Sequence, residues 1–169
     1  MKAQILHELI DRSVMSHDAF ARAESNRFRK FDSATPYGAH PVWCAMTILQ
    51  EPLLEQKLRD SGAKVLLFHD VPEDTTDALP GCMLSTQEIL WVRQMQFEGS
   101  AHKMREIWAK DKEVILFEIY DATNNYSDGA WMNEEKKAVH KAFILRLADY
   151  VEKEFGNLNI VRFARAIVA

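Results

Sequence analysis

Histidine and carboxylate residues stand beside apolar segments of this chain, where unpaired polar groups are costly. The apolar run 65–68 leads directly into His69-Asp70, and the apolar run 114–120 is followed at once by Asp121. His40 begins a further apolar segment, 40–46. A buried carboxylate or imidazole needs an opposite charge, a hydrogen-bond partner or a metal ion. Three core helices are therefore expected to deliver these groups to one place.

Together these positions offer a set of metal ligands: His40, His69, Asp70 and Asp121. Mixed nitrogen and oxygen ligation suits manganese, iron, zinc or cobalt better than calcium. Glu73 and Asp74 follow four and five residues after His69, close to the same helix face if the helix continues through Pro72. The pattern thus favours a divalent metal site with two further acids close to it in the sequence.

Each of these residues alone also has a plainer interpretation. The remaining histidines singled out, His7, His17 and His102, are read as structural or surface residues. Asp121 alone could cap a helix or form an ion pair, and Glu73-Asp74 alone could be solvated. The joint pattern, rather than any one residue, carries the metal interpretation.

Apolar residues recur at helical spacing along most of the chain, which favours an all-α fold. Helices are expected over residues 5–22, from His40 onward, over 52–58, through 65–70, after the capping box 85–88, and over 101–110, 114–120, 133–155 and 158 onward. Ser61-Gly62 is expected to break the chain between the helix over 52–58 and the helix that carries 65–70. Pro72 is expected to end or kink this second helix. No repeat or linker interrupts the pattern, so residues 1–169 are expected to form a single domain.

Composition excludes several function classes. With 47% hydrophobic residues the chain can build a sizeable core, and a net charge of -4 with mixed signs argues against nucleic acid as a partner. No signal peptide or bilayer-length apolar stretch is present, so a cytoplasmic protein without a membrane partner is expected. Cys44 and Cys82 are too few for a disulfide framework. A homo-oligomer is left open.

Three segments resemble a known family. These are "RKFDSATPYGAHP" at 29–41, "LLFHDVPEDT" at 66–75 and "VILFEIYDATNN" at 114–125. The first is similar to an Arg-Lys…Thr-Pro-Tyr-x-x-His-Pro opening, the second to a Leu-Leu-His-Asp-x-x-Glu-Asp-Thr motif, and the third to an apolar run ending in Asp with Asn four residues on. The chain resembles the HD-domain phosphohydrolases, and within them the hydrolase domain of the RelA/SpoT alarmone enzymes and the small alarmone hydrolases.

The resemblance implies a fold, a cofactor and a reaction. The fold is a single HD-domain helical bundle with a metal site between core helices. One divalent cation, manganese in the first place and otherwise iron, cobalt, zinc, nickel or magnesium, is held by His40, His69, Asp70 and Asp121. Glu73 and Asp74 stand beside the attacking water. The substrate is a small phosphorylated nucleotide, in the sharpest version guanosine 3',5'-bis(diphosphate), which loses its 3'-pyrophosphate.

The resemblance also assigns substrate contacts to Arg29, Lys30, Tyr37, Asn125, Lys136 and Lys137. Tyr37 could equally pack, Asn125 could cap the helix expected to end there, and 134–137 could be a solvated charged face. The family often has a basic residue soon after the position of Asn125, and Tyr126-Ser127 stand there instead. Two alternatives therefore remain: a phosphohydrolase of another nucleotide or phosphoester, and a non-catalytic HD domain that senses a nucleotide.

Overall fold

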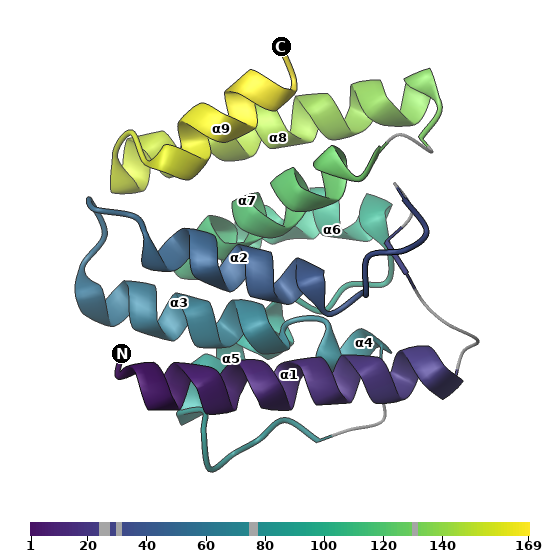
Figure 1. Cartoon of the computed structure of the whole chain (residues 1–169). Coiled ribbons are helices and arrows are strands. Elements are labelled where there is room, and N and C mark those ends of the chain that lie inside the picture. The colour runs from purple at the N-terminus through teal and green to yellow at the C-terminus, as the bar shows by residue number, and fades with distance from the viewer. Residues whose placement is uncertain (24–27, 30–31, 75–77, 130–131) are drawn as a thin grey trace.

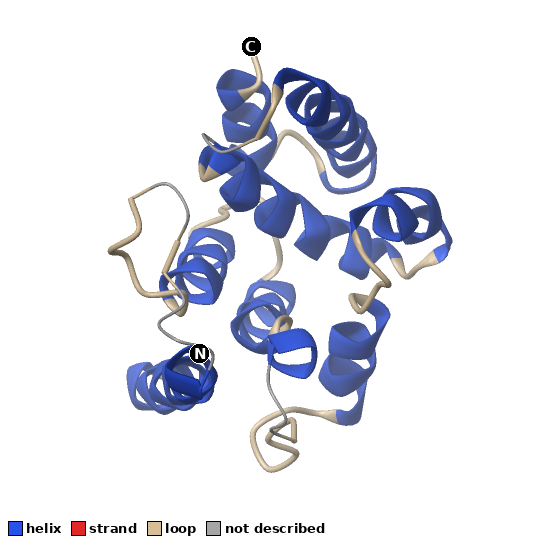
Figure 2. Cartoon of the chain, turned by 90° about the vertical axis from the view of Figure 1, so that its right-hand side faces the viewer, coloured by secondary structure: helices blue, strands red, loops and turns tan. Residues whose placement is uncertain are grey.

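The all-α fold expected from the sequence is confirmed. The computed structural model describes residues 1–23, 28–29, 32–74, 78–129 and 132–169, without the side chains of 18–23 and 74. The helices are α1 (Ala3–Ala23), α2 (Ala39–Leu49), α3 (Gln56–Phe68), α4 (Val71–Asp74), α5 (Thr86–Gln94), α6 (Ser100–Glu106), α7 (Lys112–Ser127), α8 (Glu134–Phe155) and α9 (Asn159–Ile167), with a 3-10 turn at Ile107–Ala109. The described residues form no strand (Figure 2), only an isolated bridge between Phe28 and Pro36.

Helix α7 lies at the centre of the molecule. Its apolar sequence leaves every residue from Val114 to Thr123 buried, as expected for a helix that is hydrophobic on nearly all sides. Helices α2 and α3 pack on one side of it, and α8 and α9 pack on the other. Figure 1 shows these layers, with α1 outermost beside α3. A polar residue between Val114 and Thr123 is therefore surrounded by protein.

The expected break at Ser61-Gly62 is wrong, because α3 runs through both residues without interruption. The glycine serves packing. A Cβ atom at Gly62 would lie 2.5 Å from Ile48 Cδ1 and 2.8 Å from Phe117 Cε1, closer than atoms normally approach. Gly62 thus allows α3 to press against α2 and α7. This close contact brings the end of α3 near the start of α2.

Two further expectations at helix ends have opposite outcomes. The capping box is confirmed: Ser85 Oγ accepts from the Glu88 amide at 3.2 Å, and Glu88 Oε2 accepts from the Ser85 amide at 2.7 Å. The expected position of Asp121 at the end of its helix is wrong, because α7 continues to Ser127. Asn125 consequently lies inside the helix and does not cap it.

The last helix, α9, packs on α7 and α8 of the same chain. Its first amides are satisfied by Glu51, a fully buried carboxylate from the turn after α2. Glu51 accepts from the Asn159 and Ile160 amides, each at 2.8 Å, and from the Tyr120 hydroxyl at 3.2 Å. A negative charge at a helix N-terminus is favourable, and this one also ties α9 to α7.

Among the described residues, none of the helices is long and apolar enough to cross a membrane.

Candidate metal centre

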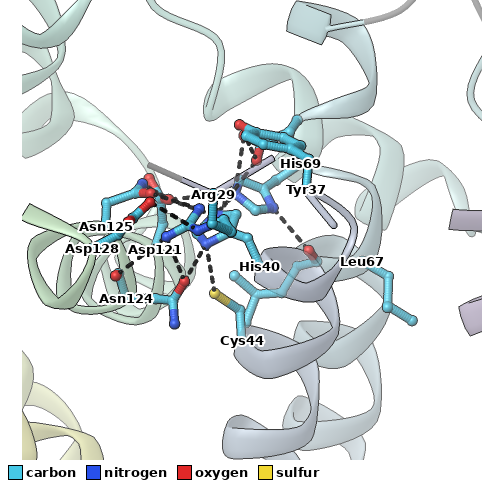
Figure 3. Close-up of polar contacts among 12 residues, drawn as sticks. Arg29, Tyr37, His40, Cys44, Leu67, His69, Asp121, Asn124, Asn125 and Asp128 are labelled. Carbon is cyan, nitrogen blue, oxygen red and sulfur yellow. Dashed lines mark hydrogen bonds and ion pairs between the residues drawn. The ribbon is translucent and has the colours of Figure 1, made fainter. Parts of the chain in front are cut away.

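The side chains predicted as metal ligands meet between α2, the end of α3 and α7, and Figure 3 shows three of them, His40, His69 and Asp121. His40 Nε2 and His69 Nε2 lie 3.3 Å apart. Asp70 Oδ1 is 3.1 Å from His69 Nε2, and its Oδ2 is 3.5 Å from His40 Nε2. Asp121 Oδ1 is 3.0 Å from His40 Nε2 and 3.5 Å from His69 Nε2.

His40, His69 and Asp70 each offer a ligand atom within 4.8 Å of the other two. A cation with bonds of about 2.1 Å holds neighbouring ligands roughly 3–4 Å apart. The distances from Asp121 Oδ1 to the two imidazole nitrogens fall in the same range. Two helix ends and a central helix position these groups: His40 lies in the first turn of α2, His69 directly follows α3, and Asp121 lies within α7.

The ring of His40 is oriented by Asn124. Asn124 Oδ1 lies 2.6 Å from His40 Nδ1 and accepts a hydrogen bond from Arg29 Nη2 at 3.1 Å. Because a guanidinium can only donate, the atom facing it is the amide oxygen, and His40 Nδ1 must carry the proton. In the neutral ring, His40 Nε2 then presents its lone pair to the centre, as a metal ligand does.

The ring of His69 is oriented by the main chain. Its Nδ1 lies 2.8 Å from the Leu66 carbonyl oxygen, which can only accept. In the neutral ring Nε2 then has its lone pair toward His40 Nε2. Two facing lone pairs are stabilised only when a proton or a cation lies between them, so the donor set fits a metal ion.

The electrostatics of the site also favour a positive charge. Burial lowers the pKa of His69, but the charges of Asp70 and Asp121 outweigh it and raise the pKa to about 9. Burial likewise disfavours the charged form of Asp121, yet the Lys103 ammonium holds the pKa of Asp121 well below its usual range. Two neutral imidazoles and two carboxylates would carry two negative charges, which match one divalent cation.

Lys103 and Glu118 are parts of the site that the sequence interpretation missed. Lys103 Nζ lies 2.8 Å from Asp121 Oδ2 and 3.4 Å from Glu118 Oε1. Glu118 is 1% exposed, and burial raises its pKa to about 8 although Lys103 counteracts this. Glu118 had a signal, because it is the one charged residue in the apolar run 114–120. Lys103 had none, since α6 carries charges of both signs.

Arg29 is held in the wall of the site. Its Nε forms an ion pair with Asp128 Oδ2 at 3.0 Å, and its Nη2 donates to Asn124 Oδ1. The residue is 5% exposed. Arg29, His40 and Trp43 border a cavity of about 310 Å³ next to the imidazole cluster. Most of the donors of Arg29 are thus engaged within the protein.

Asn125 faces the ligand cluster. Its Nδ2 donates to Asp121 Oδ1 at 2.5 Å, and its Oδ1 accepts from Arg29 Nη1 at 3.4 Å. Tyr37 stands at the edge of the cluster, with its hydroxyl 3.5 Å from Asp70 Oδ2. Both residues therefore lie beside carboxylates of the centre.

The acidic pair lies on a separate short helix, because α3 ends at Phe68 and Pro72 falls within α4. The Glu73 side chain is exposed, but the protein around it desolvates it enough to raise its pKa, and the charge of Asp70 adds to this effect. The side chain of Asp74, like the whole of Lys30, lies outside the described residues.

The two lysines of α8 differ in their surroundings. Lys137 pairs with Glu134 at 3.1 Å on the exposed face. Lys136, His140 and Ser100 border a cavity of about 520 Å³ between α6 and α8. Partial burial and the charges of Lys136 and Lys103 lower the pKa of His140. The sequence interpretation did not include His140.

Comparisons with known proteins support the fold. No protein-family profile matches the chain, and no curated protein matches its sequence. A solved structure matches with a TM-score of 0.73 and 16% identity, over 99% of this chain and 95% of the other. That protein is described as a metazoan ortholog of SpoT that hydrolyzes ppGpp and plays a role in starvation responses. The HD-domain fold expected from the sequence motifs is thereby confirmed.

Proposed function

We propose that this chain, whose fold is that of an HD-domain hydrolase, is a metal-dependent phosphohydrolase of a phosphorylated nucleotide and that residues 1–169 act as one domain. The convergence of two oriented Nε2 atoms with two carboxylates carries the proposal. The sharpest version is removal of the 3'-pyrophosphate from guanosine 3',5'-bis(diphosphate). The matched fold belongs to a protein described as hydrolysing ppGpp, which supports this version.

His40, His69, Asp70 and Asp121 are the proposed ligands of one divalent ion, with manganese as the first candidate. When bound there, such an ion lowers the pKa of a coordinated water and withdraws charge from a phosphate. Asn124 and the Leu66 carbonyl keep the imidazoles in the tautomer that binding needs. The chain thus holds the ligand atoms in place before the reaction begins. Such preorganised groups stabilise the charge that develops in the transition state.

Glu73 is the proposed proton acceptor, with Asp74 as its partner. The raised pKa of Glu73 suits a group that takes a proton from water near neutral pH. Its position on α4, immediately after Asp70, keeps it beside the centre without making it a ligand. Glu73→Gln is therefore expected to keep bound metal and lose turnover.

Two cavities are the proposed binding places of a nucleotide: one is bordered by His40 of the centre, and the other lies between α6 and α8. The cavity beside Trp43 and Arg29 offers an aromatic ring and a guanidinium plane, both suited to a base. The cavity beside Lys136 and His140 offers basic groups for phosphate. Lys30, Tyr37, Asn125 and Lys137 complete the proposed substrate contacts.

A second candidate is the same chemistry on a nucleotide with fewer phosphates. It is favoured by Arg29, whose donors already serve Asp128, Asn124 and Asn125 and leave less positive charge for a long polyphosphate.

The test is a nucleotide panel with manganese, cobalt, magnesium or zinc, in which phosphate and pyrophosphate release are both measured. Pyrophosphate from guanosine 3',5'-bis(diphosphate), absent in Glu73→Gln at equal metal content, is the expected result. Release from nucleoside monophosphates alone would favour the second candidate. Tight nucleotide binding without any release would instead identify a sensor, and no binding or release would overturn the proposal.

A further inference from the structure

The metal ligand Asp121 has two oxygens with different surroundings. Oδ1 faces the imidazoles, whereas Oδ2 is turned away and lies 2.8 Å from Lys103 Nζ. Lys103 is the contribution of α6 to this region, although no residue of that helix is fully buried. Its ammonium also lies 5.9 Å from the centre of the Phe97 ring, a favourable cation–π arrangement.

The same ammonium lies between two carboxylates of α7. Glu118 Oε1 is 3.4 Å from Lys103 Nζ, and Glu118 Oε2 is a buried atom without a hydrogen-bond partner. Glu118 stands three residues before Asp121, so both side chains project from one face of the helix. The lysine therefore fills a position bordered by carboxylate oxygens, which are the atoms that bind a divalent ion.

We infer that Lys103 is a built-in cation that takes the position a second metal ion would need, and so makes the centre mononuclear. The inference rests on the proposed metal site. A carboxylate that bridges two metals holds them about 3.5–4 Å apart. Asp121 is placed to be such a bridge, with Oδ1 toward the first ion and Oδ2 toward Lys103. Without the ammonium, the buried Asp121 carboxylate loses the positive group beside its Oδ2, which is unfavourable.

The experiment counts manganese bound to the metal-free chain and records its paramagnetic resonance spectrum. The wild-type chain binds one ion per chain, with the spectrum of isolated Mn²⁺. Lys103→Ala removes the charge and leaves space, so it binds two ions whose spectrum shows exchange coupling. Lys103→Met removes the charge but fills the space, so it binds one. Lys103→Ala combined with Glu118→Gln replaces a carboxylate ligand of the second ion with a neutral amide and also binds one.

Each outcome decides the inference. A Lys103→Ala chain that saturates at one isolated ion overturns it, and so does a wild-type chain that takes up a coupled pair. If Lys103→Ala does not fold, Lys103→Ser leaves comparable space and replaces it in the series. A wild-type chain that binds no manganese overturns the proposed metal site along with the inference, whereas one ion in both wild type and Lys103→Ala overturns the inference alone.

Discussion

The two imidazoles of the candidate centre are held by different kinds of partner. His69 Nδ1 donates to a main-chain oxygen, that of Leu66 one turn earlier in the same helix. His40 Nδ1 donates to a side-chain oxygen from another helix, that of Asn124 on α7. Asn124 is itself held by Arg29, which is paired with Asp128 (Figure 3).

This difference predicts how each half of the centre responds to change. A carbonyl oxygen is present whatever residue stands at its position, so the orientation of His69 survives substitution as long as α3 forms. The orientation of His40 depends on a chain of side chains, and each link can be removed separately. The centre should therefore tolerate changes around His69 and be sensitive to changes around His40.

The largest effect on manganese binding is expected from the loss of either imidazole, because His40 and His69 have the same proposed role. His40→Ala and His69→Ala each remove a proposed direct ligand, so manganese binding should weaken by more than the roughly 100-fold that loss of an outer partner costs. Titration of the metal-free variants measures this. His7→Ala is the control, because the His7 side chain is 76% exposed and pairs with Asp11 on the same helix face. Near wild-type binding by either ligand variant would remove that histidine from the centre.

The next largest effect is the change of stability with pH that the titration of His69 causes. In the metal-free chain the pKa of His69 is about 9, above its ordinary value of 6.5. The charged ring therefore stabilises the fold fully below pH 6.5, and this contribution is lost as the pH rises through 9. A shift of this size is worth on the order of 3 kcal/mol, or roughly 5–10 °C in Tm.

Thermal unfolding of the chelated chain at pH 6.5 and pH 9 tests this, with His69→Gln as the reference. Glu118 acts in the same direction, because its raised pKa of about 8 disfavours the charged form in the folded chain. An equal fall of Tm in His69→Gln would assign the whole effect to groups such as Glu118.

Much of this arrangement can be predicted from the sequence, because it is encoded in patterns of residues that are close together in the chain. Apolar periodicity predicts helices, and a polar residue directly after an apolar run marks a group that must find a partner, as with His69 and Asp121. Gly62 was misread because a close approach between helices and a helix break use the same residue type. Its role depends on Ile48 and Phe117, which are distant in the sequence.

The residues that contact the proposed ligands were harder to predict from the sequence for the same reason. Asn124 and Asn125 are adjacent amides, yet α7 turns the first toward His40 and the second toward Asp121. The sequence interpretation chose Asn125 alone. Lys103 reaches Asp121 across a helix packing that no local pattern encodes.

Asn124→Ala tests the side-chain link directly. It leaves the His40 Nδ1 proton without its acceptor, so the ring loses its orientation and manganese binding should weaken by about 10–100-fold, or roughly 1.4–2.7 kcal/mol. The matched control on the other half is Leu66→Met, which changes a buried side chain by a similar volume and keeps the carbonyl. Equal weakening in both variants would contradict the proposed asymmetry.

The smallest effect is expected at Arg29, which reaches His40 only through Asn124. Arg29→Met should weaken manganese binding by less than the roughly tenfold minimum for a partner in direct contact. The same variant removes the largely buried ion pair between Arg29 and Asp128, so its Tm should also fall. Lys137→Met is the control, since the exposed pair with Glu134 should contribute little.

A double-mutant cycle makes this last prediction sharp. If Arg29 acts by holding Asn124, then adding Arg29→Met to Asn124→Ala should weaken manganese binding little further, because the link is already broken. If Arg29 instead contacts the phosphates or base of a substrate, Arg29→Met raises KM and leaves the manganese Kd unchanged in both backgrounds. Measuring Kd and KM in all four chains separates these roles. A side chain with its donors directed at Asp128 and Asn124 should follow the first pattern.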